Sequence, residues 1–145
     1  MSKAWSVLAK LSDKKMQELR AQAREVESAI EVSLSRQARF TLMIKENVAR
    51  LNGSVGPVVM ADVHVIGNFI QSLSLVLQGL KAEHALLEER KNNLQESIQE
   101  TYREIKKMEA LLEREDEKKQ DKLEKKEQKV LNEAGIQRFV KSQRL

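Results

Sequence analysis

The chain has 145 residues, of which 33% are charged and only 3% are aromatic, and it contains one proline and no cysteine. This composition is typical of long helices or a coiled coil, and the lack of cysteine excludes disulfides and thiol chemistry. The 26 basic and 22 acidic residues leave a modest net charge of +4, so most charges can pair locally or be solvated.

The N-terminal residues MSKAWSVLAKLSDKK lack the apolar run of a signal peptide. We also expect no apolar stretch to reach the roughly 18–20 residues that cross a membrane. The sequence therefore predicts a soluble, cytoplasmic protein.

The first predicted helix covers residues 2–51 and carries a heptad repeat, in which positions a and d face a partner helix. We call the residues at these positions the seam. With Met16 at position a, the a residues are Ala9, Met16, Ala23, Ile30, Gln37, Ile44 and Leu51, and the d residues are Trp5, Ser12, Leu19, Val26, Ser33, Phe40 and Asn47.

A break follows, because two of the five glycines and the only proline lie between Asn52 and Pro57. Glycine permits unusual backbone angles and proline interrupts a helix, so we predict a turn over residues 52–65. The segment VVMADVHV within it is compatible with a loop or with an irregular helix start. Asp62 or Asn68 could cap the second helix.

The second predicted helix covers residues 66–138 and has the stronger heptad repeat. Its a residues are Ile70, Leu77, His84, Lys91, Ile98, Ile105 and Leu112, and its d residues are Ile66, Leu73, Leu80, Leu87, Leu94, Thr101 and Met108. Two long helices joined by a short break predict an antiparallel coiled-coil hairpin, an all-α single domain over residues 1–145. Pairing Leu51 with Ile66 sets a register that also places Ser33 opposite His84.

In this register Trp5 lies opposite Leu112, so the seam is expected to end there. The following run, Glu113–Lys129, has seven positive and seven negative residues. It is interpreted as a solvated overhanging helix or as a docking arm for a charged partner. Nucleic acid is not favoured as that partner, because the run has no net charge to displace counterions from phosphates.

The sequence contains no recognisable catalytic, metal-binding or cofactor-binding motif, and we predict no enzyme and no cofactor. His84 is interpreted as a polar seam residue that helps to set the register. His64 lies in the break and has no evident partner.

Three apolar residues outside the seam form a predicted lateral patch near the turn. Met43, Phe69 and Val76 all occupy position g, and g residues of two antiparallel helices lie on the same side of the seam. These residues cover a locally thicker core, pack under the segment VVMADVHV, or form a protein-docking surface.

The chain resembles the FliJ family of the bacterial flagellar type III export apparatus. The resemblance rests on the length, the absence of cysteine, the hairpin pattern and the segment Phe69-Ile70-Gln71-Ser72-Leu73 after the turn, with a weaker similarity in the charged tail ending near Arg138-Phe139. It departs from the family at residues 43–47, Met-Ile-Lys-Glu-Asn, where tyrosines are expected.

The resemblance implies a non-catalytic stalk that contacts an export ATPase ring (FliI-like), an export gate (FlhA-like) at the inner membrane, and export chaperones. The implied gate-binding residues are Phe40, Met43, Phe69, Leu73 and Val76. The implied ring-binding residues are Trp5, Leu8, Leu123 and Val130. The alternatives are the equivalent stalk of a virulence secretion system, a basic coiled coil that binds nucleic acid or membrane, and a dimeric scaffold.

Overall fold

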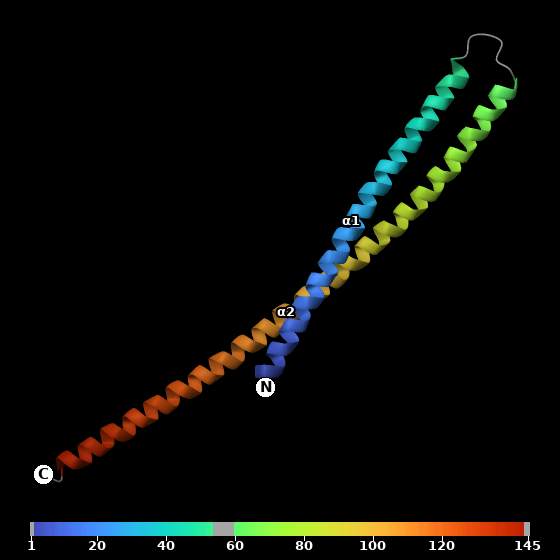
Figure 1. Cartoon of the computed structure of the whole chain (residues 1–145). Coiled ribbons are helices and arrows are strands. Elements are labelled where there is room, and N and C mark those ends of the chain that lie inside the picture. The colour runs from blue at the N-terminus through green and yellow to red at the C-terminus, as the bar shows by residue number, and fades with distance from the viewer. Residues whose placement is uncertain (1, 54–59, 144–145) are drawn as a thin grey trace. The chain divides into compact units, whose positions relative to one another are not determined.

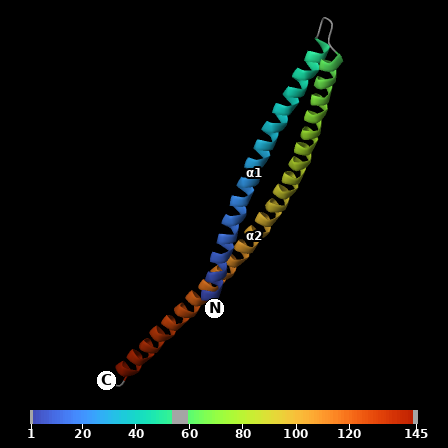
Figure 2. The ribbon, with the colours of Figure 1, turned by 45° about the vertical axis from the view of Figure 1, so that its right-hand side comes forward.

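The computed structural model describes residues 2–53 and 60–143, which form two helices, α1 (Ser2–Asn52) and α2 (Met60–Gln143). The described residues contain no strand, and the two helices pack against each other as a hairpin (Figures 1 and 2). The predicted all-α hairpin is therefore confirmed. Gly56 and Pro57, on which the turn prediction rests, lie outside the described residues.

The heptad repeat correctly predicts which side of each helix is covered. Every predicted seam residue is buried or half-buried, from Trp5 to Leu51 in α1 and from Ile66 to Leu112 in α2. Most are only half-buried, because one partner helix covers a stripe rather than surrounding a side chain. Consequently, few of the described apolar residues are buried: Met16, Val26, Ile30, Leu73 and Leu94.

The chain divides into two compact units, one of residues 17–99 and one of residues 1–16 with 100–145. In the 17–99 unit, Val26, Ile30 and Leu94 form a buried cluster, against which Leu19 and Leu87 pack. The predicted register pairs Ile30 with Leu87 and places Leu94 one step from the layer of Val26. These positions are compatible with the buried cluster.

In the unit of residues 1–16 and 100–145, the seam is small and partly polar. Ser12 and Met16 are buried, Thr101 is the most buried residue described, and the Ser12 hydroxyl donates to the Met108 sulfur at 3.7 Å. Covered positions end at Glu115, and every described side chain from 116 to 143 is exposed. The predicted end of the seam at Leu112 is thus correct to within one layer.

Helix α2 begins at Met60 instead of the predicted residue 66 and continues to Gln143, beyond the predicted 138. Asp62 lies in its first turn, where a carboxylate interacts favourably with the positive end of the helix dipole. The β-branched residues that made this segment ambiguous cost a helix only tenths of a kcal/mol each. The expectation that Asn68 could cap the helix is wrong, because Asn68 lies inside it.

The polar seam residues Ser33 and His84 make local contacts instead of a hydrogen bond across the seam. Gln37 Nε2 donates to Ser33 Oγ at 3.3 Å, and His84 Nε2 lies 3.7 Å from a carboxylate oxygen of Glu88. The other ring nitrogen, Nδ1, is buried and has no hydrogen-bond partner among the described residues. Such a group destabilises the fold, since the water it bound in the unfolded chain is not replaced.

Candidate docking surfaces

The lateral patch near the turn is largely accessible to solvent. Phe69 is 45% exposed and Val76 is 47% exposed, while Met43 is half-buried. A residue of a locally thicker core would be covered much more completely. The structure therefore places Phe69 and Val76 on the surface beside the seam, where an apolar side chain is available to a partner.

A groove elsewhere in the same unit shows how g positions are arranged across the seam. It is lined in part by Ala29 and Arg36 of α1 and by Glu83 of α2, which all occupy position g. The groove thus brings g residues of the two helices to the same side of the seam. The same heptad geometry, applied closer to the turn, predicts Met43 beside Phe69 and Val76.

The two other residues implied for gate binding lie in the seam itself. Leu73 is only 5% exposed, and Phe40 is half-buried. In the hairpin, Leu73 can therefore support the patch from beneath but offers almost no surface of its own. The structure brings the five implied gate residues to one region and separates them into exposed and supporting members.

Phe69 and Val76 lie within a stretch of α2 that has no charged side chain, between Val63 and Leu80. Helix α2 contains an 18-residue window with a mean hydropathy of 1.3, which meets the length and composition test for a membrane span. The expectation that no stretch would do so is wrong on composition. A single helix of this kind is weak evidence for a span. Only 6% of the window is buried within the structure.

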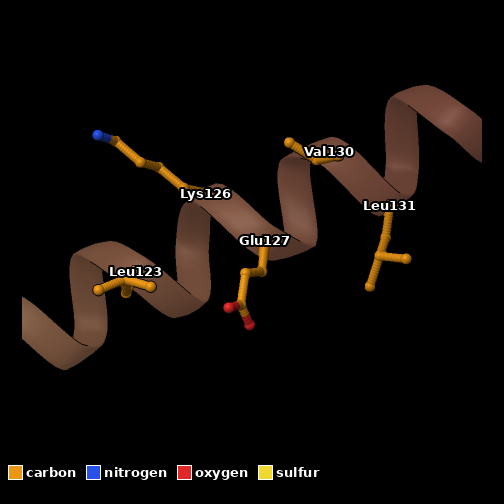
Figure 3. Close-up of a pocket in the computed structure, with 5 residues that line it drawn as sticks. All are labelled: Leu123, Lys126, Glu127, Val130 and Leu131. Carbon is orange, nitrogen blue, oxygen red and sulfur yellow. The ribbon is translucent and has the colours of Figure 1, made fainter.

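A second set of exposed apolar side chains lies in the unit formed by the two ends of the chain. In the C-terminal part of α2, Leu123 is 59% exposed and Val130 is 64% exposed. Figure 3 shows these side chains with Leu131, with Lys126 and Glu127 beside them. Leu123 and Val130 are seven residues apart, or about two helical turns, and therefore share one helix face.

The N-terminal part of α1 adds apolar surface in the same unit. Trp5 is half-buried in the seam, whereas Leu8 is 42% exposed. The sequence analysis did not single out the neighbouring Val7 and Leu11, which are 56% and 58% exposed. Their positions f and c in the heptad register, away from the seam, are the signal that could have identified them.

The described residues contain no group of three or more side chains that could hold a metal ion. Among the described residues, His84 has one acidic neighbour within ion-pair distance, Glu88. The accessible features of the described parts of both units include apolar surfaces and a run of exposed charges.

Comparison with protein families gives a match to the Flagellar FliJ protein family over residues 2–144. Comparisons with curated proteins and with solved structures give no match. The family match covers nearly the whole chain. This chain is therefore a member of the FliJ family, a component of the flagellar protein export apparatus.

Proposed function

We propose that this protein is a non-catalytic stalk that links the export ATPase to the export gate and assists the export of flagellar substrates. The observation that carries the proposal is the exposure of Phe69 and Val76 in an uncharged stretch next to the seam. Exposed apolar residues in an uncharged stretch favour aggregation of a soluble protein unless a partner covers them. The cytoplasmic part of the gate protein is the proposed partner.

The terminal unit is proposed to bind the ATPase ring. Its exposed apolar residues Leu8, Leu123 and Val130 come from both ends of the chain, and a run of alternating charges lies beside two of them. A ring can surround such a segment because apolar and charged groups occur on several sides of the helix. The unlike surfaces of the two units would give the protein separate affinities for two partners.

The proposed coupling requires a stiff connection between the binding surfaces. Within the unit of residues 17–99 the a/d seam provides stiffness, since bending this unit would expose seam residues such as Val26 and Leu94. No catalytic step is assigned to this chain. Its contribution is to position the ATPase and the gate and to favour one arrangement of the partners over another.

The test measures binding of the full chain to the gate protein's cytoplasmic domain and to the ATPase, with two variants. Phe69→Ala is expected to weaken gate binding by at least about 30-fold and to leave ATPase binding unchanged. Leu123→Ala/Val130→Ala is expected to give the opposite pattern. Loss of both interactions in each folded variant would contradict two separate docking surfaces.

A further inference from the structure

Helix α2 has a second exposed apolar face, which points away from α1 and does not belong to the lateral patch. Heptad positions c and f define this outer face, and between residues 61 and 86 none of them is charged. Three large apolar residues on it are among the most exposed of the structure: Val65 at 67%, Leu75 at 62% and Leu86 at 68%. The remaining c and f positions of the outer face are Ala61, Asn68, Ser72, Gly79 and Ala82.

Gly79 lies near the middle of this face, and no contact within the described hairpin requires a glycine there. A Cβ atom built at Gly79 meets nothing within 4 Å. Glycine is unfavourable inside a helix, because it loses more backbone freedom on folding than alanine does. A small residue on an open helix face allows another backbone to approach closely, and Ser72, two helical turns away, has the same property.

The sequence of the outer face is complementary to itself when a second copy is placed against it in the opposite direction. With a two-fold axis at Leu75 and Val76, each of these residues meets its own counterpart. Val65 of one copy then meets Leu86 of the other. By symmetry, Ser72 of each copy meets Gly79 of the other copy, so the two helices approach most closely where both side chains are small.

Charge complementarity supports the same arrangement. Asp62 and Arg90 both occupy position g, at opposite ends of the uncharged stretch, and both are exposed. In the antiparallel pair, Asp62 of each copy lies opposite Arg90 of the other copy, which gives two ion pairs related by symmetry. A parallel pair would instead place Asp62 next to Asp62 and Arg90 next to Arg90, which is unfavourable.

We therefore propose that the outer face of α2 binds the same face of a second copy of this chain, as an antiparallel pair whose two-fold axis passes by Leu75 and Val76. Such an interface is isologous and closed, so it gives dimers and not chains of molecules. It covers Val76, which also belongs to the lateral patch. Pairing and partner binding at the patch would consequently compete, and a partner would meet the protein in its monomeric form.

The absence of native cysteine permits a direct test by single-cysteine variants of the full chain under mild oxidation. Leu75→Cys is expected to form a disulfide between two copies. Val65→Cys and Leu86→Cys are expected to remain monomeric when each is alone and to cross-link when they are mixed. Leu42→Cys is the matched control, because Leu42 is 56% exposed on α1 and should not cross-link. Cross-linking of Val65→Cys or Leu86→Cys with itself would overturn the antiparallel arrangement.

Sedimentation equilibrium tests the pairing without oxidation. The apparent mass of the unmodified chain is expected to rise with concentration from 16.6 kDa toward twice that value. Gly79→Leu is expected to raise the dimer dissociation constant at least about tenfold, because it blocks the closest approach of the helices. Gly67→Leu is the matched control, since a Cβ there also meets nothing within 4 Å but Gly67 lies off the outer face. A mass that stays at 16.6 kDa up to millimolar protein would overturn the proposal. This holds also if the protein is found to bind phospholipid vesicles, because the exposed face would then contact lipid and not a second copy.

Discussion

Replacing Phe69 by alanine separates a docking role from a role in packing, and the structure gives the size of the two effects. Phe69 is 45% exposed, whereas Leu75, which only its own helix covers, is 62% exposed. A fully buried phenylalanine side chain buries about 200 Å², so the difference between the two exposed fractions corresponds to about 35 Å² of Phe69 that the hairpin covers. At about 25 cal/mol per Å², packing against the hairpin contributes about 1 kcal/mol. A fully buried phenylalanine would contribute about 3–5 kcal/mol.

Two measurements on the same variant check this reasoning. Thermal or urea unfolding of Phe69→Ala should show a loss of about 1 kcal/mol, and titration with the gate protein's cytoplasmic domain should show a loss of at least about 2 kcal/mol. Leu34→Ala is the matched control, because Leu34 is 49% exposed away from the patch and should keep full binding. Leu73→Ala is the core control and should cost about 2–5 kcal/mol of stability. A loss of more than about 3 kcal/mol of stability in Phe69→Ala, with binding by the folded fraction intact, would refute the docking role.

Three further outcomes are expected. His84→Leu should raise the free energy of unfolding by about 1–2 kcal/mol, because it removes a buried nitrogen without a partner and adds apolar surface to the seam; a destabilised variant would show that the imidazole makes a favourable contact. In hydrogen exchange of the isolated protein, residues 116–143 should exchange faster than residues 66–112, because they lack covered side chains; equal protection would contradict this. The double variant Leu123→Ala/Val130→Ala should change stability by less than about 0.5 kcal/mol, as measured by urea unfolding, because both side chains are exposed; a larger loss would place them in a packed core.

Part of the candidate site could be predicted from the sequence because heptad position determines the direction of a side chain. Heptad position g alone predicts that Met43, Phe69 and Val76 lie on one side of the seam. The degree of exposure could not be predicted in this way, because it depends on how far a neighbouring helix covers the flank of the seam. The pattern likewise does not distinguish Leu73, which is buried, from Phe40, which remains half-buried.

The heptad pattern is sufficient to predict the helical hairpin, the side on which each helix is covered and the end of the seam near Leu112, because a repeat of seven residues keeps its apolar positions on one face of a helix. The tertiary structure decided the start of α2 at Met60 and the local contact of His84 with Glu88. The heptad repeat specifies neither of these features. The start of a helix depends on the balance between the helix dipole and side-chain entropy in the first turn. The partner of a polar side chain depends on which group is within hydrogen-bonding distance. The structure also showed the uncovered outer face of α2, since a single partner helix can bury only one stripe of another.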